Sequence, residues 1–359
     1  MIYSVRRIDR VFILVMICAG VAAVALYSLT SRSLITLRNP AIAFIGNPLI
    51  APEIWSVSID GNSLKRLTST GGTVYDFAIS PDGAVIVYSV HNSNGSSALY
   101  RTDRAGRDAQ ILVECGQARC ETPAWSNDGR YIAYSQIARV NDKNTRIVTI
   151  IPVKGQLPAE WPDKLITGTN PVFSPDGQKL AMNNPEEGFI RILGLSSGVE
   201  RQVRTSAPDP VTWSADSNYI YFNENEVTGV LLQSRLFQVG LTTMQIELFL
   251  PAQLSSFDAG GMRITRDGTW AAFALRSGDN QAGRQIYISK MDGSQFQAVT
   301  DESSTWHTAI QWSPDGNRLV YQEYTPGTAN AVPRVLVWDR VSGEFIVAAE
   351  NGALPAWLP

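Results

Sequence analysis

The chain has 359 residues, of which 44% are hydrophobic and 18% are charged, and its formal net charge is −3. A chain of this length forms one large domain or two ordinary ones. The acidic balance argues against a nucleic-acid-binding protein, because such proteins carry a surplus of basic side chains on one face. The hydrophobic content excludes a chain that is disordered over most of its length.

An uncharged and largely apolar segment occupies residues 11–31 near the N-terminus. At a helical rise of about 1.5 Å per residue, it is long enough to cross a bilayer core of about 30 Å. Arg6, Arg7 and Arg10 precede it, so the positive-inside rule places residues 1–10 in the cytoplasm. We therefore expect a single-pass cell-membrane protein with an anchor at 11–31, a linker at 32–40 and an extracytoplasmic domain at 41–359.

A cleaved signal peptide is the alternative interpretation of the same segment. Ala23, Val24 and Ala25 form the small-x-small pattern that precedes signal-peptide cleavage. Both interpretations place residues 41–359 outside the cytoplasm.

Three short apolar stretches follow the linker: "AIAF" from Ala41, "IWSVSIDG" from Ile54 and "LKRLT" from Leu64. Their length and the turn residues between them indicate β-strands. The fragment lacks the opening hairpin strand that every later unit has.

One hairpin pattern then recurs six times, with apolar residues on both sides of a turn that carries Asp and usually Gly. Gly adopts the positive φ that such a turn needs, and Asp bonds to the amides of the turn itself. Each copy has a Ser or Thr immediately before the turn, which we call the marker. The markers are Ser80, Ser126, Ser174, Ser214, Thr265 and Ser313.

A third strand and usually a fourth follow each hairpin, so that each unit has four antiparallel strands in about 47 residues, as in a propeller blade. The C-terminal "NGALPAWLP" repeats only the opening strand of the unit. Together with the fragment at 41–68 it completes one more blade. The sequence predicts an all-β, seven-bladed β-propeller in which the N- and C-terminal strands share a blade. Six or eight blades remain possible, because the Thr265 unit is irregular.

An aromatic or apolar residue precedes each marker and occupies the same strand position in every unit. This constant position indicates packing between blades rather than a carbohydrate-stacking surface. The seven residues are Ile79, Trp125, Phe173, Trp213, Ile264, Trp312 and Trp357.

Cys115 and Cys120 lie five positions apart in a predicted loop. A disulfide is our hypothesis for this pair, because oxidation is permitted outside the cytosol. Free thiols are one alternative. A metal pair is another, although no further Cys or nearby His completes a ligand set.

The repeats, which read "SPDG" and "IAY" in the hairpin and "DG" and "LT" after the third strand, resemble the TolB-type, WD40-like repeats of bacterial cell-envelope proteins. The resemblance covers the chain from about Ile42 to its C-terminus. It implies a propeller in the periplasm or an equivalent compartment, and it says little about function. TolB itself has a separate α/β domain before six blades, so partner binding by that extra domain is not carried over.

Long, variable loops are expected on one face of the propeller, which we call the loop-rich face, at 90–98, 137–145, 223–234, 276–284 and 323–333. Such loops on a rigid scaffold usually carry binding. The opposite face, with the short hairpin turns, is the short-turn face.

Polar residues stand four to six positions ahead of five markers and are expected to ring the mouth of the central channel. They are Asp76, Glu121, Asn170, Asp209 and His307. A mostly acidic ring could take a cation or the basic end of a peptide, and ordinary water-filled lining is the alternative. His91 and His307 are expected to be surface side chains.

The sequence contains no recognisable catalytic motif, and we predict no cofactor, no metal site and no catalytic residue. The leading hypothesis is a membrane-anchored, extracytoplasmic scaffold that binds a protein or peptide partner through its loop-rich face. The alternative is a lyase or hydrolase acting on cell-envelope or imported saccharides at the channel mouth.

Overall fold

A computed structural model describes residues 40–359 except 141–142, 160, 162–165, 207–208, 229–230, 250–257, 277–282, 302–303, 326 and 328–330. The predicted membrane segment at 11–31 lies outside the described residues. Within the described part of the chain, no helix is both long enough and apolar enough to span a bilayer.

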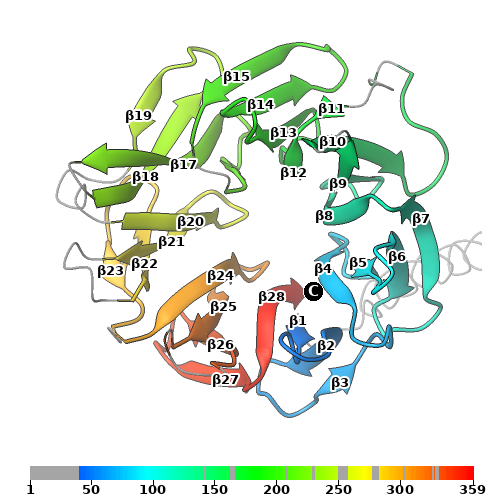
Figure 1. Ribbon diagram of the computed structural model, residues 1–359. Coiled ribbons are helices and arrows are strands. Elements are labelled where there is room, and N and C mark those ends of the chain that lie inside the picture. Colours follow the sequence, from blue (N-terminus) through cyan, green and yellow to red (C-terminus); the bar gives the residue numbers. More distant parts are fainter. Residues whose placement is uncertain are drawn as a thin grey trace, which may run out of the picture. The chain divides into compact units, whose positions relative to one another are not determined.

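The described residues form seven four-stranded antiparallel sheets, which Figure 1 shows as blades around a central opening. The predicted seven-bladed, all-β propeller is therefore confirmed. Blade 1 consists of β28 (Gly352–Leu358), β1 (Ala41–Gly46), β2 (Glu53–Ser58) and β3 (Lys65–Arg66).

The other six blades follow one another along the chain, each listed from its innermost to its outermost strand. Blade 2 has β4 (Val74–Ile79), β5 (Val85–His91), β6 (Ser97–Asp103) and β7 (Gln110–Gly116). Blade 3 has β8 (Arg119–Trp125), β9 (Tyr131–Val140), β10 (Lys143–Pro152) and β11 (Ile166–Thr167). Blade 4 has β12 (Thr169–Phe173), β13 (Lys179–Asn184), β14 (Phe189–Gly194) and β15 (Glu200–Arg204). Blade 5 has β16 (Thr212–Trp213), β17 (Tyr219–Thr228), β18 (Leu231–Gly240) and β19 (Ile246–Leu248). Blade 6 has β20 (Asp258–Ile264), β21 (Trp270–Arg276), β22 (Gln285–Lys290) and β23 (Gln297–Ala298). Blade 7 has β24 (Trp306–Trp312), β25 (Arg318–Tyr324), β26 (Arg334–Asp339) and β27 (Phe345–Ala349).

Blade 1 closes the ring by pairing the two ends of the domain. Strand β28 runs antiparallel to β1, with Leu358 opposite Ala41 and Trp357 opposite Ile42. The side chain of Arg104, from blade 2, donates hydrogen bonds to the carbonyls of Leu358 (3.0 Å) and Pro359. The edges that would otherwise be left unpaired are thus joined within one sheet.

Each hairpin turn is held by the marker and the Asp two residues later. In blade 4, Ser174 Oγ donates to Asp176 Oδ1 (2.5 Å) and accepts the N–H of Lys179 (2.9 Å). The same arrangement recurs from Ser80 to Ser313. In blade 5, hydrogen bonds from Ser214 and then from the N–H of Asn218 lower the pKa of Asp216. The turn motif therefore has a structural role, which is to fix the register of the two inner strands.

Apolar side chains fill the spaces between neighbouring blades. Ile42, Phe44 and Trp357 of blade 1 pack against Val320 and Val335 of blade 7. Three tryptophans that precede a marker, and Trp357 at the equivalent position of blade 1, also donate their indole N–H to a carbonyl on the innermost strand of the preceding blade. These bonds run from Trp125 to Ala78, Trp213 to Val172, Trp312 to Arg263 and Trp357 to Gln311, at 3.1–3.3 Å. The contacts agree with the predicted packing between blades.

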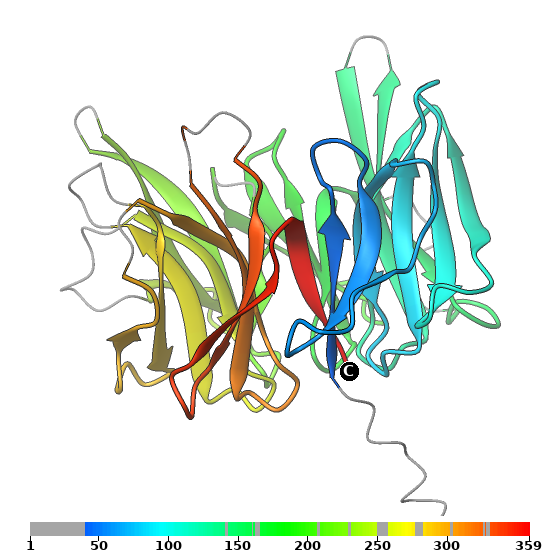
Figure 2. The same cartoon turned by 90° about the horizontal axis from the view of Figure 1, so that it is seen from below.

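Two of the expected loops are in fact strands. Residues 137–145 and 223–234 fall mostly within β9, β10, β17 and β18, which are ten-residue strands. These hairpins extend from the ring on the loop-rich face. Figure 2 shows the C-terminus and the start of β1 together on the opposite, short-turn face.

Candidate functional site

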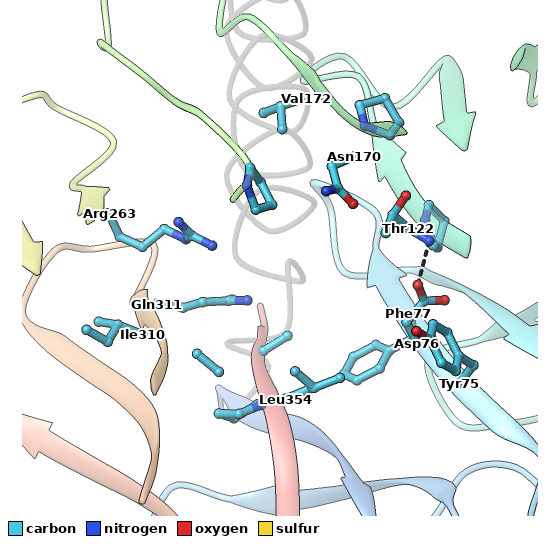
Figure 3. A pocket seen from close by; sticks show the side chains of 16 residues that line it. Tyr75, Asp76, Phe77, Thr122, Asn170, Val172, Arg263, Ile310, Gln311 and Leu354 are labelled. Carbon is cyan, nitrogen blue, oxygen red and sulfur yellow. Dashed lines mark hydrogen bonds between the residues drawn. The ribbon is translucent and has the colours of Figure 1, made fainter. Parts of the chain in front are cut away.

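A cavity of about 640 Å³ occupies the centre of the ring and is lined by residues from all seven blades (Figure 3). Blades 2, 3, 4, 6, 7 and 1 contribute residues of their innermost strands, and blade 5 contributes Pro210. Most of the lining is apolar, and four prolines belong to it: Pro123, Pro171, Pro210 and Pro355. A pocket of this size, with few polar groups on an apolar wall, is typical of a ligand site.

A β-bulge in the innermost strand brings backbone and side chains towards this cavity. The register between the first two strands shifts after Glu121, Thr169 and Thr308, for example. Thr122 and Asn170 have positive φ values of 52° within the bulge, and Ala309 has 51°. Bulges of this kind re-aim side chains and are common beside functional sites. They explain why residues about four positions before the marker reach the channel.

Asp76 lines the cavity, but its carboxylate already accepts hydrogen bonds from other residues of the propeller. Its Oδ1 accepts a hydrogen bond from Ser89 Oγ and its Oδ2 accepts one from the N–H of Thr122, both at 2.5 Å. Protein atoms surround the carboxylate although the residue as a whole is partly exposed, and this burial raises the pKa of Asp76 to about 6. Asp76 therefore links blade 2 to blade 3.

Glu121 and Asn170 differ in their placement. The Glu121 side chain is buried away from the main cavity, and its Oε1 lies 3.3 Å from Arg119 Nε. Asn170 lines the cavity, and its backbone N–H donates to Ser135 Oγ (2.9 Å). Of the five predicted residues, Asp76 and Asn170 thus lie at the main cavity.

The other two predicted residues line an adjoining pocket of about 200 Å³ towards the loop-rich face. Asp209 is exposed there. His307 is only 1% exposed, so the expectation of a surface side chain was wrong. Its Nδ1 lies 2.9 Å from the carbonyl of Arg284 and its Nε2 lies 3.2 Å from Glu323 Oε2. Both ring nitrogens therefore face acceptors inside the fold.

His91 lies at the rim of the channel. Its ring stacks on Tyr75 with centroids 4.4 Å apart, and its Nε2 lies 3.2 Å from the carbonyl of Cys120. Cys120 is joined to Cys115 by a disulfide in the structure, with the two Cα atoms 6.2 Å apart. The disulfide closes the short connection between β7 and β8 behind this rim.

Arg263 is a cavity residue that sequence reasoning missed. It lines both pockets, and its side chain extends into the channel from β20, on the opposite side from Asp76 (Figure 3). The side chain of Gln311 on β24 also extends inwards. Both residues stand two positions before a marker, so aligning the repeats at that position would have found them. The wall of the main cavity therefore carries a cationic side chain, Arg263, as well as the acidic Asp76.

The described residues contain no group of three or more His, Cys, Asp and Glu side chains arranged to hold a metal. The polar side chains of the cavity wall include one guanidinium, two carboxamides and the Asp76 carboxyl, and these groups can form hydrogen bonds with a ligand inside a mainly apolar wall.

The fold and the channel define the class of protein: a closed β-propeller with a central cavity. No family model matches the chain. A 165-residue segment is 27% identical to a protein named "Protein TolB homolog" from Chlorobium luteolum, covering 45% of this chain and 35% of that protein. The matched segment thus covers about a third of that relative's length.

Two solved structures show the same fold. TolB from Acinetobacter baumannii superposes with a TM-score of 0.53 at 14% identity, over 89% of this chain and 67% of that one. Pyrococcus horikoshii acylaminoacyl peptidase gives 0.62 at 14% identity, over 88% of this chain and 51% of that one. At such identities the likeness concerns the fold alone. With the repeats and the sequence match, the chain resembles TolB-type β-propeller repeat proteins.

Proposed function

We propose that this propeller is a scaffold of the bacterial cell envelope that binds a protein or peptide partner through its loop-rich face. The proposal includes a single-pass anchor at 11–31, with residues 1–10 in the cytoplasm and the propeller outside it. The TolB-type fold and the recognition chemistry of the channel support binding rather than catalysis.

The observation that carries the proposal is the set of long loops and hairpins on the loop-rich face. The β9–β10 and β17–β18 hairpins extend from this face, and the 200 Å³ pocket with Asp209 and His307 lies towards it. Ile50 (91%) and Val227 (75%) are exposed apolar side chains of this face, and Val341 (80%) is one of the short-turn face. Long loops on a rigid scaffold commonly carry binding.

The length of the linker bears on the proposed anchoring. The chain enters the propeller at Ala41, the first residue of β1. A linker of about ten residues spans at most ~35 Å. The proposed anchor at 11–31 therefore keeps the propeller close to the bilayer.

Site-specific photo-crosslinking in native membranes tests this proposal. A photoreactive residue replaces Asn94, which is exposed between β5 and β6 on the loop-rich face. The matched control replaces Asn127, which is exposed in a short turn on the other face. We expect one dominant adduct from position 94 and none of the same mass from position 127. Equal adducts from both positions, or none from position 94, would contradict the proposal.

A further inference from the structure

Arg263 differs in charge and size from the residues that occupy the equivalent position in the other blades. Each blade has one residue two positions before its marker, or before Leu358 in blade 1, where the chain ends instead of turning. In the other six blades these residues are Ala78, Ala124, Val172, Thr212, Gln311 and Ala356. None of the six is charged and five of them are small. A single large cation therefore projects from one side of a ring of short side chains.

Most of the hydrogen-bonding capacity of this guanidinium is unused. An arginine side chain has five N–H donors. Among the described residues, Arg263 donates one bond from its side chain, from Nη1 to the carbonyl of Met262 (2.7 Å), and no carboxylate lies within ion-pairing distance. Asp209 acts on it only at longer range, and burial lowers the pKa of Arg263. Protein atoms surround the guanidinium although the residue as a whole is partly exposed at the cavity wall, and an anionic ligand there would compensate its charge.

The other residues of the cavity wall indicate the chemical group that would carry such an anion. Around Arg263 the wall is formed mainly by proline rings, Phe77, Val172, Ile310 and Leu354. The one acidic side chain of the wall, Asp76, already accepts two hydrogen bonds from Ser89 and Thr122. The carboxamide of Gln311 stands beside Arg263 on the neighbouring blade and can share an anionic oxygen.

We propose that the central channel is a carboxylate receptor, in which Arg263 forms a two-point hydrogen bond with a carboxylate carried by an apolar group. The planar fork of a guanidinium matches a carboxylate in this way. The inference rests on the proposed function and names the chemistry of the partner segment: an acidic side chain or a C-terminus among apolar residues. The proposed ligand is an anion, whereas the sequence alone suggested a cation or the basic end of a peptide.

Benzoate is the probe, since it is an apolar carboxylate small enough for the cavity, and benzamide is its uncharged counterpart. Binding to the full-length protein in detergent is measured by ligand-observed NMR at pH 7. The test variant is Arg263→Gln, and the matched control is Arg266→Gln, an exposed arginine three residues later in the turn. Thermal melting checks that both variants remain folded.

We expect benzoate to bind the wild type and Arg266→Gln alike, and to bind Arg263→Gln at least about tenfold more weakly. Benzamide should bind all three proteins weakly. Equal binding of benzoate to Arg263→Gln, or no binding of benzoate to the wild type, would overturn the inference.

Two short peptides identify the source of the carboxylate. Acetyl-leucyl-leucine offers a C-terminal carboxylate, and acetyl-aspartyl-leucinamide offers one on a side chain. Tighter binding of the first assigns the channel to a C-terminus, and tighter binding of the second assigns it to an acidic side chain.

Crosslinking from position 94 in the Arg263→Gln background separates this inference from the proposed function. Loss of the adduct in that background supports both. An adduct that persists undiminished leaves the scaffold proposal standing and removes the carboxylate receptor from it.

Discussion

At the scale of single residues, side chains at similar repeat positions can have different structural roles. Asp76 and Asn170 were predicted from spacing, and both lie at the cavity. Glu121 has a comparable spacing but is buried against Arg119, because the bulge after it turns the next residue towards the channel. Which residue of a bulge faces inwards depends on backbone geometry that the sequence does not reveal. Arg263 is different, because it lies after the bulge of its strand, and its position two residues before the marker is a repeat signal that the sequence does contain.

Asp76 should lower the free energy of unfolding as the pH rises, which is the opposite of the usual effect of a carboxyl group. Burial raises its pKa from 3.8 to about 6 in the folded state, so the folded protein binds more protons than the unfolded chain between these values. The free energy of unfolding therefore falls as the pH rises from 4 to 6, by up to about 3 kcal/mol from this group. Asp76→Asn keeps the shape and a hydrogen-bonding group but cannot ionise.

Urea denaturation of wild type and Asp76→Asn at pH 4.5 and 7 checks this prediction. The variant should gain stability relative to the wild type at pH 7. The control is Asp60→Asn, because hydrogen bonding by Ser58 lowers the pKa of the exposed Asp60, which stays ionised throughout this range. The same difference at both pH values would show that the Asp76 carboxyl does not titrate in this window.

At the scale of elements, the hairpin turn is the unit that the sequence predicts best. Its Ser or Thr, Asp and Gly act within a few residues of one another, so local chemistry determines the structure. The β9–β10 and β17–β18 hairpins were predicted as loops because their polar residues resemble loop composition. Their strands are ten residues long and extend beyond the other blades, where polar side chains suit a solvated strand.

Ser174→Ala should destabilise the propeller by about 1–2 kcal/mol, because it leaves the N–H of Lys179 and the carboxylate of Asp176 without their shared partner. Ser174 is fully buried. Ser196→Ala, an exposed change in the same blade, should alter stability by less than about 0.5 kcal/mol. Chemical denaturation measures both. Equal effects of the two substitutions would mean that the marker hydroxyl does not hold the turn.

At the scale of the whole molecule, the number of blades followed from counting hairpins, and ring closure followed from two incomplete fragments of one unit. The charge at the channel centre did not follow, because it depends on how seven separate segments converge. The placement of the N-terminal segment stays a prediction, since it lies outside the described residues.

Removing residues 353–359 should open the ring. The deletion exposes the edge of β1 and uncovers Ile42 and Phe44, and it loses Trp357, whose burial alone is worth about 4–6 kcal/mol before opposing terms. We expect aggregation and loss of the cooperative melting transition, measured by size-exclusion chromatography and thermal unfolding. A soluble, cooperatively melting truncation would show that blade 1 is complete without β28.

The most direct test of the closed ring is a disulfide across its seam. Ala43 of β1 lies opposite Ala356 of β28, and opposite pairs in antiparallel strands lie within disulfide range. The control pairs Ala43 with Ala124, which occupies the same repeat position as Ala356 in blade 3. Mass spectrometry of oxidised, unreduced peptides should find a 43–356 cross-link in Ala43→Cys/Ala356→Cys and no 43–124 cross-link in Ala43→Cys/Ala124→Cys. Absence of the 43–356 cross-link, or equal yields from both pairs, would contradict a propeller whose two ends share one blade.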